Sequence, residues 1–295
     1  MTTSPMGRDT LWRLITLGPS VGVFLALTAL PILGLLAMSF SDVTWVQAVP
    51  HWSYAGTRHF RALPQDQLFR AGISNTVLFA IAAVLVQMVL GFFLALASSK
   101  VSRGRVLYRT IFILPILVPG IVIGAIWKLM YNYDFGVINQ IIGLLGLAPQ
   151  DWLGQKGTAL LSVIAVDCWH WTPFCFLLLL AGLESQPQDV YEAAKVDGAG
   201  PWGELAYITV PLMLPTIVVT LVFRLIVAFK VFDEVFLLTG GGPGTATEVI
   251  SFTIYRRFFT EDRVGHGSAI SVATLFVLAV LIVLALAAAR RRVKA

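Results

Sequence analysis

The sequence predicts an all-α integral membrane protein, built as a bundle of six membrane-spanning helices. Apolar residues make up 57% of the chain. Charged residues make up only 13%, against about 25% in an average soluble domain. The apolar residues gather in six runs, and each run is long enough to cross a hydrocarbon core of about 30 Å as a helix. These observations exclude a soluble globular class.

The six predicted spans fill residues 14–289, between a tail at residues 1–13 and a basic tail at residues 290–295. A mixed polar and aromatic loop, Ser41–Arg70, follows the first span. Pro115 and Pro119 lie within the third span and are expected to kink it. The spans are placed at Leu14–Phe40, Ile73–Ser98, Ile111–Tyr131, Leu160–Leu183, Met213–Leu238 and Ala269–Ala289.

Basic residues predict which side of the membrane holds the two termini. Six spans place both termini on one side. The clustered Lys and Arg residues fall together on that side, namely Arg8, Arg13, Lys100, Arg103, Arg105, Arg109, Arg290, Arg291, Arg292 and Lys294. The positive-inside rule therefore predicts cytoplasmic termini. Arg256, Arg257 and Arg263 oppose this weakly and are outnumbered. Because the basic residues lie at span ends, the net charge of +5 does not indicate nucleic-acid binding.

A polar loop at about residues 184–211 separates the fourth and fifth spans. Its charges and prolines cannot lie in hydrocarbon, so it is expected to fold in water on the cytoplasmic side. Asp189–Val196 is predicted to form a short helix that stops at Gly198. Small Ala193 and Ala194 are expected to leave one face of this helix open to close approach by another molecule.

The sequence predicts no catalytic, cofactor or metal site in this chain. It lacks the phosphate-binding pattern G-x-x-x-x-G-K-[ST] and any His, Cys or carboxylate cluster at metal-ligand spacing. The glycine turn Gly240–Gly244 has no following Lys and is predicted on the outer side. Cys168 and Cys175 are two helical turns apart, about 10 Å, which is too far for a disulfide. They are interpreted as packing residues.

The loop between the fourth and fifth spans resembles the EAA loop of ABC importer permeases. The matching residues are Glu192-Ala193-Ala194, Gly198 six positions after the Glu, and Ile208-x-Val210-Pro211. The family has Leu where this chain has Val210, which is a conservative exchange. The alternative interpretation of this loop is an ordinary cytoplasmic loop helix.

The resemblance extends from about Arg70 to the C-terminus. The chain is similar to the first-permease type of the carbohydrate-uptake ABC importers, such as maltose, glycerol-phosphate and polyol permeases. The further matches are Ile113-Leu114-Pro115 with Pro119 and Trp127, Trp169-x-x-Thr172-Pro173-Phe174, Ala181–Pro187, Phe232-Asp233, Leu238–Gly244 and Gly265–Ile270.

This resemblance implies partners and a site of mechanical coupling. It implies two ATPase chains that bind ATP and Mg, a second permease, usually a different chain, and an extracytoplasmic substrate-binding protein. A homodimer stays open from the sequence. It also implies location in the bacterial cytoplasmic membrane, surrounded by lipid. The implied ATPase-coupling residues are Glu192, Ala193, Ala194, Asp197 and Gly198.

Polar and aromatic side chains within the fourth and fifth spans are the candidate substrate path. Asp167, Trp171 and Phe174 are spaced i, i+4 and i+7, so they share one helical face. His170 lies close to that face, and Arg224 begins a face of the fifth span. The resemblance places the family's sugar contacts on these two faces. Aromatic rings can stack on the C–H surface of a sugar, and Asp or Arg can bind its hydroxyls.

Other structural and functional interpretations of these residues stay open. Asp167 and Arg224 could form an ion pair that lines no path, and Trp171 and His170 could be packing residues. As a pathway residue, Arg224 would favour an anionic sugar derivative. The residues Lys230, Asp233 and Glu234 are expected to snorkel or pair near the interface. The rival functions are an ion-coupled transporter with Asp167 as proton site, and an intramembrane enzyme using Asp167, His170 and Cys168 or Cys175.

Overall fold

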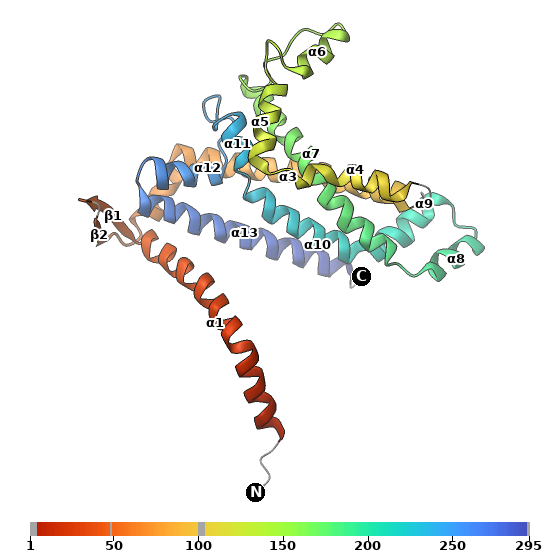
Figure 1. Cartoon of the computed structure of the whole chain (residues 1–295), viewed down its shortest axis with the longest axis horizontal. Coiled ribbons are helices and arrows are strands. Elements are labelled where there is room, and N and C mark those ends of the chain that lie inside the picture. The colour runs from red at the N-terminus through yellow and green to blue at the C-terminus, as the bar shows by residue number, and fades with distance from the viewer. Residues whose placement is uncertain (1–4, 48, 100–103, 294–295) are drawn as a thin grey trace. The chain divides into compact units, whose positions relative to one another are not determined.

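A computed structural model describes residues 5–47, 49–99 and 104–293 of the chain (Figure 1). Lys100, Arg103 and Lys294, which belong to the predicted cytoplasmic clusters, lie outside the described residues. The chain divides into two compact units. Unit 1 comprises residues 1–63 and 254–273, and unit 2 comprises residues 64–253 and 274–295.

Unit 1 holds a long apolar helix and a β-hairpin. Helix α1 runs over Pro5–Ser39. Strands β1 (Ser41–Val46) and β2 (Val49–Tyr54) pair antiparallel, with Ser41 opposite Tyr54 and Val46 opposite Val49. The all-α prediction is therefore wrong for this short segment. Its β-branched and aromatic residues favour the extended backbone of a pleated ribbon. The other described elements that lie within unit 1 are α2 (Arg58–Ala62) and the π-turn Arg256–Thr260.

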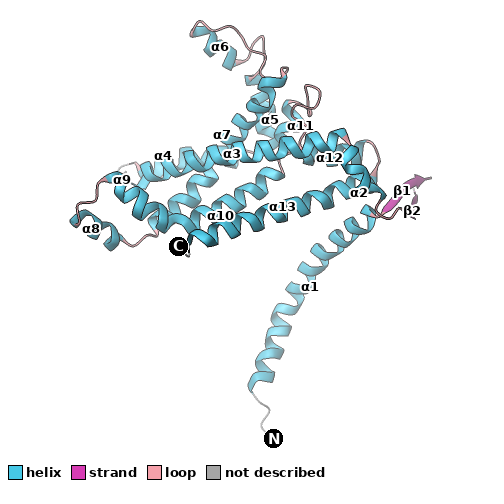
Figure 2. Ribbon diagram, turned by 180° about the vertical axis from the view of Figure 1, so that it is seen from behind, coloured by secondary structure: helices cyan, strands magenta, loops and turns pink. Residues whose placement is uncertain are grey.

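Unit 2 is a bundle of long helices, visible from both sides in Figures 1 and 2. Its members are α3 (Gln67–Ser99), α7 (Lys156–Glu184), α10 (Val210–Phe229) and the later part of α13 (Val264–Val293). Helices α3 and α7 pack closely at Gly91. A Cβ atom there would lie 2.8 Å from Cβ of Cys175. A small residue at this point lets the two backbones approach.

The predicted third span is two helices rather than one kinked helix. Helix α4 (Arg105–Leu117) and helix α5 (Gly120–Met130) are bent by 98° at the break between them. Val118 has an extended backbone, with ψ 127°, because a residue before proline disfavours the helical region. The predicted kink is thus confirmed, as a bend of 98° between two helices.

Five described helices are long and apolar enough to cross a membrane, and the bent pair α4 and α5 would make a sixth. The predicted fifth span is also interrupted: α10 ends at Phe229, and three residues separate it from α11 (Asp233–Leu238). Helix α11 packs on α5, where Gly120 and Gly124 face Asp233 and Leu237. The six-span prediction therefore stands at five candidate spans, of which Pro201–Leu238 contains this interruption, and the bent pair α4 and α5 as a sixth.

Short elements fill the connections. They are the 3-10 turn Leu63–Gln65, α6 (Val137–Leu144), α8 (Gln188–Val196), α9 (Pro201–Glu204), the π-turn Leu205–Thr209 and α12 (Ile250–Tyr255). In both views α8 and α9 lie together at one end of unit 2. Helix α6 was not expected from the sequence. Asn139 holds its segment closed by bonding the backbone of Tyr133 and Gln150 and the indole of Trp152.

Candidate functional site

Helix α8 forms within one residue of the predicted position. Its outer face carries Glu192, Ala193 and Val196, all exposed. Ala194 lies on the other face and is only 7% exposed, because the rest of the chain packs against it. The expectation of an open face is therefore right for Ala193 and wrong for Ala194.

Glycine ends α8 as predicted. Gly198 has φ +78°, a left-handed conformation that L side chains rarely adopt. The backbone N–H of Ala199 donates to the carbonyl of Ala194 at 2.9 Å, and that of Gly198 donates to the carbonyl of Lys195 at 3.2 Å. These bonds satisfy carbonyls at the end of the helix, as in a Schellman motif. Asp197 is the C-cap residue and is exposed. The turn fixes where the chain leaves α8.

Large apolar side chains are exposed around this polar loop. Val196 is 87% exposed, Trp202 79% and Tyr207 84%. Large exposed apolar side chains are candidates for contact with another molecule where they form a contiguous patch. The sequence analysis did not single out Trp202 or Tyr207, although aromatic residues in a charged loop are a usable signal.

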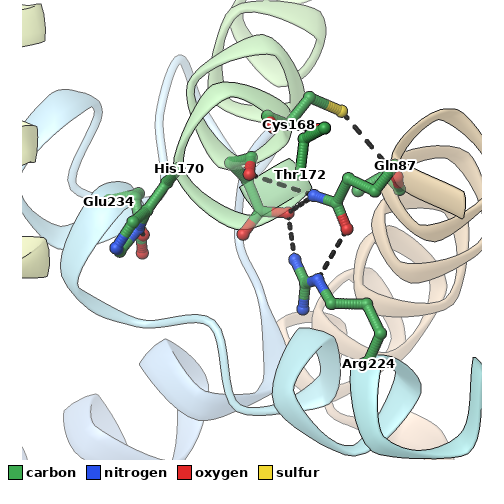
Figure 3. A network of polar contacts seen from close by, with 8 residues as sticks. Gln87, Cys168, His170, Thr172, Arg224 and Glu234 are labelled. Atoms are coloured by element: carbon green, nitrogen blue, oxygen red, sulfur yellow. Dashed lines mark hydrogen bonds and ion pairs between the residues drawn. The ribbon is translucent and has the colours of Figure 1, made fainter. Parts of the chain in front are cut away.

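A second polar cluster lies inside the bundle, where α3, α7 and α10 meet (Figure 3). Gln87, Asp167 and Arg224 are at most 2% exposed. The Gln87 Nε2 donates to the backbone carbonyl of Asp167 at 3.0 Å and to its Oδ2 at 2.8 Å. Arg224 Nε donates to Gln87 Oε1 at 2.6 Å, and Arg224 Nη2 forms an ion pair with Asp167 Oδ2. The cluster therefore ties three helices together through paired charges.

Gln87 was missed by the sequence analysis. A polar amide within the apolar second span is the signal that could have found it, since polar groups at membrane depth are functional candidates. Asp167 and Arg224 do form an ion pair, and Asp167 also lines the cavity described below.

The aromatic residues of the predicted face do meet. The guanidinium carbon of Arg224 lies 5.2 Å from the ring centroid of Trp171, a cation–π geometry. The rings of Trp171 and Phe174 are edge-to-face at 6.1 Å. However, Phe174 packs against the apolar core around Phe176 and Leu179. On the predicted face, Asp167 thus belongs to the polar cluster, Trp171 contacts Arg224, and Phe174 is a packing residue.

A cavity of about 390 Å³ opens beside this cluster, and we call it the α7–α11 cavity. Its polar lining comes from Asp167, His170, Trp171, Lys230, Asp233 and Glu234. Arg224 and Phe174 do not line it. The cavity therefore gathers three of the five predicted substrate-path residues.

His170 and Glu234 form a buried pair at this cavity. His170 Nδ1 lies 3.1 Å from Glu234 Oε1, and the two residues are 6% and 5% exposed. Glu234 was expected to snorkel or to pair, and it pairs, with the buried His170 of α7 as its partner. Lys230 and Asp233 are exposed, as expected.

The rival enzymatic site is not assembled in the part of the chain that the structure describes. Cys168 points toward α3, where its Sγ donates to the carbonyl of Ala83 at 3.8 Å. His170 instead faces Glu234, on the other side of α7 (Figure 3). Both cysteines are free thiols. Among the described residues, no group of three or more His, Cys, Asp or Glu could hold a metal.

Curated relatives of this chain are permease proteins. The trehalose/maltose transport system permease protein MalF of Thermococcus litoralis is 39% identical over 257 residues, which cover 87% of this chain and 86% of that protein. The sulfoquinovosyl glycerol transport system permease protein SmoG of Agrobacterium fabrum is 31% identical over 264 residues, 90% of this chain and 85% of the relative.

Solved structures share the fold over nearly the whole length. A chain of a bacterial ABC transporter involved in import of the acidic polysaccharide alginate matches with a TM-score of 0.83 and 30% identity, covering 97% of each chain. A chain of a bacterial alginate ABC transporter, in complex with its pentasaccharide-bound periplasmic protein, matches with a TM-score of 0.84 and 28% identity, covering 98% and 97%.

The family model described as "Binding-protein-dependent transport system inner membrane component" matches residues 87–294. This match begins at Gln87 of the buried cluster and includes α8 and the α7–α11 cavity. The chain therefore belongs to the family of binding-protein-dependent transport system inner membrane components.

Proposed function

We propose that this chain is the permease subunit of an ATP-driven importer of sugars or sugar derivatives in the bacterial cytoplasmic membrane. Family membership confirms the resemblance found in the sequence, and it identifies a transport subunit rather than an enzyme. The sugar class is supported by relatives named for trehalose, maltose, sulfoquinovosyl glycerol and alginate. Both termini are assigned to the cytoplasm from the positive-inside rule.

The partners follow from the family and from α8. The importer would contain a second, different permease, two ATPase chains that bind ATP and Mg, and an extracytoplasmic binding protein that delivers the substrate. Helix α8 would lie in a groove of the ATPase. The observation that carries this proposal is the exposed outer face of α8, where Glu192 and Ala193 stand free of the rest of the chain. Asp197 and Gly198 would hold the turn at the end of that face, and Ala194 would let α8 pack closely on its own chain.

The α7–α11 cavity is the proposed substrate path of this subunit. Trp171 would stack on the C–H face of a sugar, and Asp167, His170 and Glu234 would exchange hydrogen bonds with its hydroxyls. Arg224 does not line the cavity and would act indirectly, by orienting the side chains of Asp167 and Trp171. Because Asp167 pairs with it, Arg224 alone does not argue for an anionic substrate. Phe174 would support the ring of Trp171.

Reversing one charge on the outer face of α8 tests this function. Glu192→Lys is expected to lower ATP-dependent sugar uptake at least tenfold in proteoliposomes, about 1.4 kcal/mol or more in coupling, because it would break a polar contact to the ATPase. The melting temperature of the isolated permease should not change, since Glu192 is exposed and has few contacts within the chain.

Asp134→Lys is the matched control, because Asp134 is an exposed acid in a loop remote from α8 in sequence. It should leave uptake unchanged. Normal uptake by the Glu192→Lys importer, with both ATPase chains retained, would refute the assignment of α8.

A further inference from the structure

A second cavity, of about 560 Å³, lies on the inner side of α8. We call it the inner cavity. Helix α8 contributes Gln188, Tyr191 and Lys195, which are spaced i, i+3 and i+7 and so share one face. Glu192 borders this face, because it lies four positions after Gln188 and three before Lys195, whereas Ala193 lies on the opposite side of the helix. Glu192, Ala193 and Val196 do not line the inner cavity, and the inner cavity shares no lining residue with the α7–α11 cavity.

The other walls of the inner cavity belong to the ends of the long helices and to the loop that follows α8. Ser99 ends α3, Glu184 ends α7, and Glu204 lies in α9. A molecule bound here would touch α8 on one side and the ends of two spans on the other.

The polar groups of this cavity suit a ligand rich in hydroxyl groups. Tyr191 Oη is buried and has no hydrogen-bond partner among the described residues. A buried hydroxyl without a partner is unfavourable, so a ligand or water that bonds to it is stabilising. Gln188 can both donate and accept, Lys195 donates, and Glu204 accepts.

Charge limits the class of ligand further. Glu184 forms an ion pair with Arg109 of α4. Among the described lining residues, this leaves one ammonium, on Lys195, and one carboxylate, on Glu204. The described part of the wall thus carries no excess positive charge for a phosphate or a nucleotide. Balanced donors and acceptors in a concave site of this size favour a small neutral molecule.

We propose that the inner cavity is a binding site for a small neutral polyhydroxylated molecule, such as the imported sugar, and that an occupant slows the ATP-driven movement of α8. This proposal rests on the proposed function, because that function makes α8 the moving part and releases sugar on this side. A ligand bonded to α8 and to the ends of α3 and α7 favours the arrangement in which they are held together. ATP-driven movement would then work against the binding free energy of the ligand.

The test uses the complete importer in proteoliposomes with the ATPase chains facing outward. Binding protein and labelled sugar are trapped inside, ATP is added outside, and unlabelled trehalose or maltose is titrated outside. Each rate of ATP hydrolysis is normalised to the same preparation without external sugar. The wild-type rate should fall along a saturable curve. Tyr191→Phe and Glu204→Gln should each raise the half-inhibitory concentration at least threefold, and the double variant at least tenfold.

Tyr207→Phe is the matched control, because Tyr207 is an 84% exposed tyrosine of the same loop that does not line the cavity. Its curve should follow that of the wild type. A flat wild-type curve, or superimposed curves for the wild type and the double variant, would overturn the proposal. If external sugar inhibited by binding in the α7–α11 cavity instead, the curves of the wild type and the double variant would superimpose. Failure of the proposed function is distinct, because ATP would then move no labelled sugar in the wild type.

Discussion

The outer face of α8 and the buried cluster around Arg224 each contain a carboxylate, in opposite surroundings. On α8, Glu192 is exposed to solvent. In the cluster, Gln87, Asp167 and Arg224 are at most 2% exposed and bond to one another. A charge whose partners lie within the chain stabilises the bundle, whereas an exposed charge is left for another molecule.

The two regions should therefore respond differently to mutation. A buried charge that loses its partner remains desolvated and destabilises the protein strongly. An exposed charge contributes little to stability because water screens it. Substitutions in the buried cluster should mainly lower the free energy of unfolding. Substitutions on α8 should lower the coupling of ATP hydrolysis to uptake and leave the fold intact. The predictions below sharpen this contrast, in order of expected effect.

The largest effect is expected from Asp167→Ala. It leaves the Arg224 guanidinium buried without its carboxylate, which should cost about 3–5 kcal/mol. Thermal unfolding of the purified permease in detergent would show a clear drop in melting temperature. The double variant Asp167→Leu with Arg224→Met removes both charges and should recover most of the loss. An unchanged melting temperature for Asp167→Ala would show that the ion pair does not stabilise the bundle.

A smaller loss is expected from Gln87→Leu. This change removes the acceptor for Arg224 Nε and the donors to Asp167, and it leaves buried polar atoms unsatisfied, at about 1–3 kcal/mol. Denaturation monitored by tryptophan fluorescence would measure the difference. Gln140→Leu on exposed α6 is the control, and its unfolding curve should follow that of the wild type. If both variants unfold alike, Gln87 is not part of a stabilising network.

The smallest effect on stability is expected at Gly198. Gly198→Val forces a β-branched side chain into a left-handed conformation, at about 1–2 kcal/mol, and should distort the end of α8. Sugar-stimulated ATP hydrolysis should fall for this variant, while Gly198→Asn should retain more activity because Asn tolerates that conformation. Gly200 has φ −77°, so Gly200→Ala should leave hydrolysis unchanged. Equal activity of Gly198→Val and wild type would contradict a role for the turn.

Several features of the structure could be predicted from local sequence patterns. Runs of apolar residues located the helices, because span length depends only on bilayer thickness. Helix α8 was located by its charges and by the glycine that stops it. The EAA-like residues identified the family, and the matched model confirmed it.

Features that depend on distant partners required the tertiary structure. Gln87 and Arg224 are 137 positions apart, and His170 and Glu234 are 64 apart, so no local pattern pairs them. The prolines predicted a kink, but the packing of α5 against α11 accompanies its 98° bend.

The sequence by itself determined that this is a membrane protein with a water-exposed helix between its fourth and fifth apolar segments, because composition and spacing act locally. The tertiary structure decided which polar side chains are satisfied within the chain and which face of α8 stays exposed, because burial and pairing depend on segments that meet only after folding.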